Sequence, residues 1–128
     1  MSNDFQPGMP AWHDLTVADG EVVKQFYEAV IGWTAQPVDM DGYQDFNMMP
    51  PGAEAPAAGI CHARGGNADM PPQWLVYFSV ADLDSSLLQV HAQGGTMIKG
   101  PVDMGAMGRY ALIRDPAGAI CALYSRGQ

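Results

Sequence analysis

The stretch Gly108–Tyr124, GRYALIRDPAGAICALY, decides the fold of this chain. Its centre, Asp115-Pro116-Ala117-Gly118, is typical of a tight turn, because proline fixes φ and glycine permits a positive φ. Apolar residues lie on both sides of this turn. The stretch therefore predicts two strands joined as a β-hairpin.

The hairpin ends the second of two similar halves. In the first half we expect a strand at 12–17, an amphipathic helix from Asp19 to Gly32, and strands at 33–38, 43–49 and 58–64. In the second half we expect a strand at 74–80, a helix capped by Asp82 or Asp84 and ended by Gly94-Gly95, a strand at 96–99, a loop at 100–107 and the hairpin. The order of elements is the same in both halves.

Short sequence matches support a repeat. Thr16-Val17-Ala18-Asp19 recurs 63 positions later as Ser79-Val80-Ala81-Asp82, and Gly59-Ile60-Cys61 recurs 60 positions later as Ala119-Ile120-Cys121. The sequence predicts one α+β domain of two β-α-β-β-β modules packed as pseudo-symmetric halves. Module 1 covers about 10–64, a linker 65–72, and module 2 about 73–126.

Composition limits the class of protein. The chain has 128 residues, 48% of them hydrophobic, but no run near the ~20 apolar residues of a membrane span. Residues 1–9 resemble a loose arm without the features of a signal peptide, and two cysteines are too few for a disulfide framework. We therefore expect a cytoplasmic protein. A net charge of −8 argues against nucleic-acid binding.

Several markers together resemble the vicinal oxygen chelate superfamily, which includes glyoxalase I, extradiol dioxygenases and bleomycin-resistance proteins. The markers are Val17-Ala18-Asp19, Phe26-Tyr27, Gly32-Trp33, Val80-Ala81-Asp82-Leu83, Gly94-Gly95, Gly108-Arg109 and Asp115-Pro116-Ala117-Gly118. Trp74 and the short second module are most similar to a glyoxalase-like branch of uncharacterised, hydroxylase-type and antigen-type proteins. The resemblance implies two modules whose curved mixed sheets surround a cleft and, in metal-dependent members, a divalent ion held by about four side chains.

The resemblance places those ligand positions at Trp12, Leu75 and Ala122, with His62 as the mate of Ala122 if the 60-residue offset holds. Only His62 has a donor for a metal, and a catalytic divalent ion usually needs three protein ligands. We therefore predict no metal and no other cofactor. A one-residue slip would bring His13 to the first position, but would also turn Leu15 and Val17 into the cleft.

Candidate functional residues follow from this mapping. His62 and Asp14 are candidate catalytic groups, as general bases, with a hydrogen-bonded core or rim histidine and a solvated carboxylate at a strand end as the structural alternatives. Arg109 is a candidate clamp for an anion, or the partner of an acidic side chain. The expected ligand-binding residues are Trp12, Phe46, Met48, Trp74, Leu75, Tyr77, Arg109, Ala122 and Tyr124.

Two functions remain open. The first is metal-independent binding of a small, partly apolar or aromatic molecule in the cleft, as bleomycin-resistance proteins bind their ligand without chemistry. The alternative is an enzyme, a glyoxalase-like lyase or an oxygenase or hydroxylase, which is metal-dependent if the mapping of ligands is wrong. A third and weaker possibility is a regulatory module whose cleft is closed by side chains. We expect a homodimer in every case.

Overall fold

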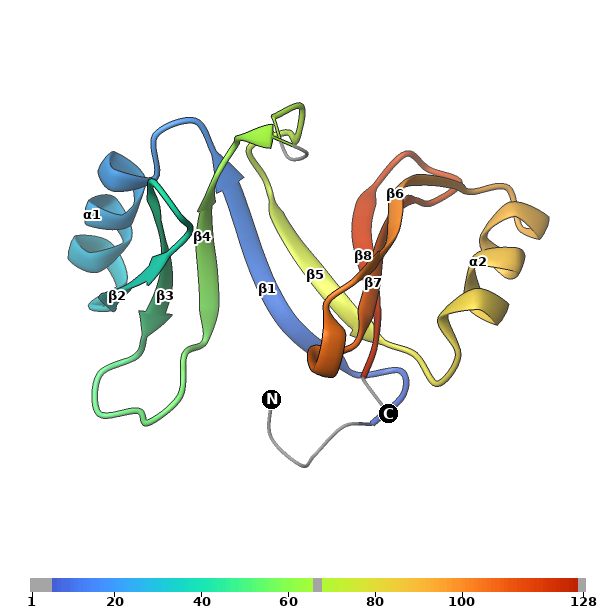
Figure 1. The fold of residues 1–128 in the computed structure, drawn as a ribbon, viewed down its shortest axis with the longest axis horizontal. Helices are drawn as coiled ribbons and strands as arrows, with labels where there is room; N and C mark the ends of the chain where they lie inside the picture. The colour runs from blue at the N-terminus through green and yellow to red at the C-terminus, as the bar shows by residue number, and fades with distance from the viewer. Residues whose placement is uncertain (1–5, 66–67, 127–128) are drawn as a thin grey trace. The chain divides into compact units, whose positions relative to one another are not determined.

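The computed structural model of the chain describes residues 6–65 and 68–126 (Figure 1). The contacts divide it into two compact units, each considered by itself below. One unit is His13–Trp74, and the other joins the residues up to Trp12 to those from Leu75 onward. The two strands that cross these boundaries are described with the unit that holds most of their residues. Residues 66 and 67 of the predicted linker and residues 1–5 of the predicted arm lie outside the described residues.

The first unit contains β1 (Pro10–Val17), α1 (Gly20–Ile31), β2 (Thr34–Asp39), β3 (Gln44–Met49) and β4 (Ala58–His62). Its strands lie in the order β2-β3-β4-β1. β1 and β4 are parallel, and the other neighbours are antiparallel. This is the predicted β-α-β-β-β connectivity.

The second unit contains β5 (Trp74–Ser79), α2 (Leu83–Ala92), β6 (Thr96–Asp103), a short 3₁₀ helix η2 (Gly105–Met107), β7 (Arg109–Arg114) and β8 (Ile120–Ser125). Its strands lie in the order β5-β8-β7-β6, and β5 is parallel to β8. The α+β class is confirmed, and both units share one connectivity.

The β7–β8 hairpin forms as its sequence predicts. Gly118 has a φ of +95°, and one Asp115 carboxylate oxygen accepts hydrogen bonds from the backbone amides of Ala117 and Ala119. Proline and glycine fix the backbone of the turn while the aspartate satisfies its amides. The strands then pair from Arg114 and Ile120 back to Arg109 and Ser125.

Both helices begin at the expected caps. The Asp19 carboxylate accepts from the amide of Val22, and the Asp82 carboxylate accepts from the amide of Ser85. α1 ends at Gly32, whose φ of +88° is the left-handed conformation that glycine favours. Of the two caps considered for the second helix, Asp82 is therefore correct.

Each helix covers one face of its own sheet. Under α1 the core is Leu15, Phe46, Met48 and Ile60, and under α2 it is Leu83, Leu87, Ala111 and Ile113. Within the described part of the chain, no helix is long and apolar enough to cross a membrane.

Two predictions about irregular segments are wrong. Residues 100–103 belong to β6 and not to a loop, because Val102 and Asp103 pair with β7 across an irregular register. Residues 8 and 9 are not loose, since the amide of Gly8 donates to the Ser79 carbonyl and Met9 accepts from the Ser79 amide. Pairing with a neighbouring strand outweighs the loop-like composition of both segments.

Candidate functional site

The strand register assigns each side chain of the first unit to one face of the sheet. Leu15 of β1 pairs with Ile60 of β4, and both lie in the core under α1. Side chains alternate along a strand. Asp14 and Thr16 of β1, with Gly59 and Cys61 of β4, therefore lie on the face away from α1.

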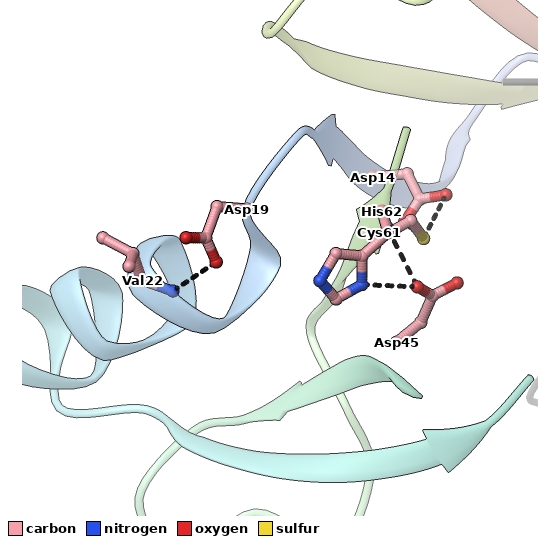
Figure 2. A network of polar contacts seen from close by, with 6 residues as sticks. All are labelled: Asp14, Asp19, Val22, Asp45, Cys61 and His62. Carbon is pink, nitrogen blue, oxygen red and sulfur yellow. Dashed lines mark hydrogen bonds and ion pairs between the residues drawn. The ribbon is translucent and has the colours of Figure 1, made fainter. Parts of the chain in front are cut away.

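A thiol and a carboxylate meet on this face. Cys61 Sγ lies 3.5 and 3.7 Å from the two Asp14 oxygens and donates its proton to them (Figure 2). Burial raises the pKa of the Cys61 thiol far above its ordinary value, and the negative charges of Asp14 and Asp45 raise it further. The group is a protonated donor at neutral pH and is not a nucleophile.

His62 lies on the opposite face, under the start of α1. Its ring packs against Gly20, where an added Cβ would lie 2.9 Å from the ring carbon Cε1. One Asp45 oxygen accepts from the His62 amide at 2.9 Å and lies 3.3 Å from Nδ1 (Figure 2). The structure therefore does not bring His62 and Asp14, the two candidate catalytic residues, together on one surface.

The corresponding face of the second unit is apolar and aromatic. Leu75 and Tyr77 of β5 share this face with Ala122 and Tyr124 of β8, because Tyr77 pairs with Ala122 and the α2 core takes Leu123 and Cys121. Tyr110 of β7 pairs with Tyr124, and its ring centroid lies 5.8 Å from that of Tyr77. Four of the predicted ligand-binding residues thus share one sheet face, on which Leu75, Ala122 and Tyr124 are buried and Tyr77 is partly exposed.

Tyr124 and Tyr110 have polar neighbours on this surface. The Tyr124 hydroxyl donates to the Met107 carbonyl at 2.7 Å. Burial raises the pKa of Tyr124, against the opposing effect of Arg126. The Lys99 ammonium lies 5.8 Å from the centroid of the Tyr110 ring.

Other predicted ligand-binding residues lie elsewhere. Phe46 and Met48 are 2% and 0% exposed in the α1 core, so their assignment to an open surface is wrong. Trp74 also packs toward α1, and its indole nitrogen donates to the Tyr27 hydroxyl at 3.0 Å. Arg109 points to α2, where both terminal nitrogens bond the Asp84 carboxylate. Of its two expected roles, the structure shows the pair with an acid.

Trp12 is half-buried and lies on the same side of β1 as Asp14, while His13 is exposed on the side of Leu15. The alternative register with His13 in the first ligand position is therefore wrong, because Leu15 and Val17 pack on the α1 core. A slip of one residue would expose both of them.

The strand register also corrects the predicted offset between the two halves of the repeat. Asp14 pairs with Gly59 and Tyr77 pairs with Ala122, so the last strands of the two units are related by the same 63-residue offset as the first strands. The mate of Ala122 is Gly59, and the equivalence with His62 is wrong. Cys61 corresponds to Tyr124, so the prediction that Cys61 and Cys121 are equivalent is also wrong.

With this correction, the four ligand positions of the metal-dependent pattern carry Trp12, Leu75, Gly59 and Ala122. None of these side chains offers a metal ligand. No group of three or more histidine, cysteine, aspartate or glutamate side chains in residues 6–65 and 68–126 has a metal-binding arrangement. The residues present do not fit the divalent ion of that pattern.

Sequence reasoning missed Asp45, Tyr110 and the role of Cys61. Alternation along 109–114 places Tyr110 and Leu112 on one face of the strand and Ile113 on the other. The face of Tyr110 could therefore have been predicted from the sequence. Asp45 was not, because its carboxylate bonds the backbone of a strand 17 positions later.

Comparison with known proteins agrees with this fold. A family model described as the Glyoxalase/Bleomycin resistance protein/Dioxygenase superfamily matches residues 10–122. The anthracycline biosynthesis protein DnrV of Streptomyces peucetius is 34% identical over 134 residues, which cover 96% of this chain and 49% of DnrV. "Putative glyoxylase CFP32" of Mycobacterium tuberculosis is 31% identical over 131 residues, which cover 95% of this chain and 47% of CFP32.

The chain spans about half the length of these curated relatives. Among solved structures, methylmalonyl-CoA epimerase from Mycobacterium tuberculosis is similar with a TM-score of 0.59 at 20% identity, covering 100% of this chain and 93% of the epimerase. Protein BH1468 of Bacillus halodurans C-125 gives 0.66 at 12% identity, covering 96% and 97%. These likenesses show the fold. The connectivity of both units and the family match together establish that this chain belongs to the Glyoxalase/Bleomycin resistance protein/Dioxygenase superfamily.

Proposed function

We propose that the chain binds a small, partly apolar or aromatic molecule on the helix-free sheet face of its second unit, without a divalent metal. One observation carries this proposal: aromatic and apolar side chains gather on the helix-free face of the second unit. Tyr77 and Tyr110 are partly exposed there, above the buried Leu75 and Ala122. Aromatic rings with a polar edge suit planar organic molecules.

The helix-free face of the first unit, considered by itself, carries a polar pair. Asp14 accepts a hydrogen bond from the neighbouring Cys61 thiol, and a carboxylate has about four accepting positions. Gly59 of β4 pairs with Asp14 of β1 and has no side chain that could cover the Asp14 carboxylate. A ligand hydroxyl or amine is the group that Asp14 would orient.

The names of the relatives support a small organic ligand. DnrV is described as a protein of anthracycline biosynthesis, and anthracyclines are planar aromatic molecules. The match covers nearly all of this chain but half of DnrV, so an anthracycline is a probe of the ligand class and not an assignment.

Isothermal titration calorimetry with a panel of planar aromatic compounds, including an anthracycline, tests this proposal. We expect saturable binding that EDTA leaves unchanged. Tyr77→Ala should weaken it about tenfold, the effect of losing ~1.4 kcal/mol from an aromatic contact. Leu88→Ala, at an exposed site on α2, is the control. Binding that disappears with EDTA and returns with a divalent metal contradicts the proposal.

The alternative function is a glyoxalase-like lyase or an oxygenase-type enzyme. Asp14 favours it, since a carboxylate on an uncovered sheet face beside a thiol that stays protonated can act as a general base. His62 does not share that face. Turnover of a bound compound that Asp14→Asn abolishes and His62→Ala retains would establish this alternative over simple binding.

We also propose a homodimer. The cytoplasm remains the expected location, and nucleic acid is not an expected partner of a chain with a net charge of −8.

A further inference from the structure

The helix-free face of the second unit carries a lysine beside its tyrosines. Lys99 of β6 pairs with Leu112 of β7, and Leu112 pairs with Ala122 of β8. Residues that lie opposite each other in an antiparallel pair share one face of the sheet. Lys99 is partly exposed, and its ammonium lies 5.8 Å from the centroid of the Tyr110 ring. A positive charge therefore adjoins the partly exposed Tyr77 and Tyr110.

An irregularity in β6 directs Lys99 to this face. Met97 pairs with Ile113, whose side chain lies in the α2 core. In a regular ladder Lys99, two residues later, would face α2 as well. The register shifts between Met97 and Lys99, so that Lys99 pairs with Leu112 instead. Bulges of this kind re-aim side chains and are frequent next to active sites.

A second irregularity lies on the other side of Lys99. The register shifts again before Val102, which pairs with Tyr110. Gly100 lies within this shift, with a φ of +110°, and an added Cβ would lie 3.0 Å from the Tyr110 carbonyl oxygen. The backbone thus departs from a regular strand on both sides of Lys99. The direction of this side chain is a feature of the fold.

The acidic residues of the second unit are engaged elsewhere. Among its described residues, Asp82 and Asp115 accept from backbone amides at the α2 cap and in the hairpin turn. Asp84 bonds Arg109 on the side of α2, and Asp103 pairs with Arg109 across β6 and β7. The acids that dominate the charge of the whole chain are therefore directed away from Tyr77 and Tyr110 in this unit.

A second positive charge lies near the same tyrosines. Arg126 follows β8 directly, and its charge acts on the Tyr124 hydroxyl, where it opposes the effect of burial on the pKa of Tyr124. Tyr124 pairs with Tyr110. In a chain of net charge −8, the helix-free face of the second unit is thus flanked by two cations.

We propose that this face binds a planar aromatic anion and that Lys99 holds the anionic group of the ligand. The inference rests on the proposed function and adds the charge of the ligand to it. A ring stacked beside Tyr77 and Tyr110 would bring a carboxylate attached to it near the ammonium, which has three N–H donors. The tyrosine rings by themselves would also attract a cation, but Lys99 repels one.

Isothermal titration calorimetry with three probes of one ring system tests this inference. The probes are 2-naphthoate, the neutral 2-naphthamide and the cationic 2-naphthylmethylammonium. We expect the wild type to bind the naphthoate about tenfold more tightly than the amide, as for one contact between charged groups, and the cation most weakly. The preference for the naphthoate should decrease as sodium chloride is added.

Two lysine variants assign the preference to one residue. Lys99→Gln should bring the ratio of the naphthoate and amide affinities to about one, and Lys99→Arg should retain most of it because the charge remains. Lys24→Gln is the matched control, since Lys24 lies on α1 with Glu21 and Glu28 and should not affect the ratio. A purely structural loss in Lys99→Gln would weaken both probes alike and leave their ratio unchanged.

The outcomes separate this inference from the proposed function. Equal affinities of the wild type for the naphthoate and the amide, or a preference for the cation, overturn the inference and leave aromatic binding in place. A preference for the naphthoate that survives in Lys99→Gln also overturns it. If none of the three probes binds, the face is not an aromatic site, and both the inference and the proposed function are wrong.

Discussion

Cys61 shows how the fold changes the chemistry of one residue. Burial and the neighbouring Asp14 and Asp45 carboxylates raise the pKa of its thiol. Thiolate is the reactive form, so iodoacetamide at pH 8 should label Cys61 much more slowly than a free cysteine. Asp14→Asn removes one negative charge and should accelerate this labelling. Peptide mass spectrometry measures both rates, and fast labelling of the wild-type thiol would contradict the assignment.

The same shift makes stability depend on pH. The pKa of the folded Cys61 thiol lies above its ordinary value of 9.0, so the stabilisation is fully present below pH 9. Above pH 9 the unfolded chain releases this proton while the folded chain keeps it, and the stabilisation is lost as pH rises toward the folded pKa. Urea midpoints at pH 8 and pH 10 should therefore differ more for the wild type than for Cys61→Ala. Equal differences in the two proteins would refute this.

Gly20 and His62 form a close contact that a single methyl group would disturb. The Cβ of Gly20→Ala would lie 2.9 Å from the His62 ring, which Asp45 holds in place. We expect a cost of about 1–2 kcal/mol from overpacking, even though alanine favours helices. In a His62→Ala background the same change should be neutral or stabilising. A thermal or urea double-mutant cycle measures the coupling, and additive effects would show that the contact is not constraining.

At the scale of elements, the last hairpin depends on Gly108. Its φ of +104° and ψ of −156° form a conformation that only glycine adopts readily, and an added Cβ would meet the Ser125 carbonyl oxygen. Gly108→Ala should cost more than ~2 kcal/mol by strain and overpacking together. Gly118→Ala, with open space around its Cβ, should cost about half as much, by strain alone. Urea unfolding compares them, and equal costs would argue against the clash.

Local chemistry explains which elements could be predicted from sequence. The caps at Asp19 and Asp82 and the turn at Asp115–Gly118 depend on residues within a few positions of each other. The second half of β6 depends on pairing with β7, and no local signal in 100–103 outweighs its glycine and proline. Elements fixed by their neighbours in sequence were predicted, and an element fixed by a distant strand was not.

Over the whole molecule, the candidate site was predictable only in part, because register is a long-range property. Alternation gave the shared face of Trp12 and Asp14, and the resemblance gave the position of Leu75. The mate of Ala122 depended on how far β8 is shifted along β5. A match of three residues suggested an offset of 60 residues between the last strands of the two units, but the parallel pairing requires 63. The shorter offset assigned His62 to the wrong face of the sheet.

The acidic charge of the whole chain should appear in its salt response. Fourteen acidic residues against six basic ones leave a net charge of −8, whose self-repulsion destabilises the compact state. Sodium chloride screens this repulsion. The melting temperature should therefore rise between low and physiological ionic strength. A flat or falling melting temperature, measured by scanning calorimetry, would show that the acids are locally compensated.

The parallel pairing of the first and last strands of each unit also determines when these strands can pair during synthesis. Asp14 cannot pair until Gly59 has been synthesised, and Tyr77 cannot pair until Ala122 has been synthesised. Each partner lies 45 positions later in the chain. At a ribosomal rate of 5–20 residues per second, each wait lasts roughly 2–9 s. During it Leu15 has no parallel partner, and Gly8 cannot bond Ser79 until β5 emerges. The nascent chain thus carries an apolar strand without its parallel partner during two separate intervals.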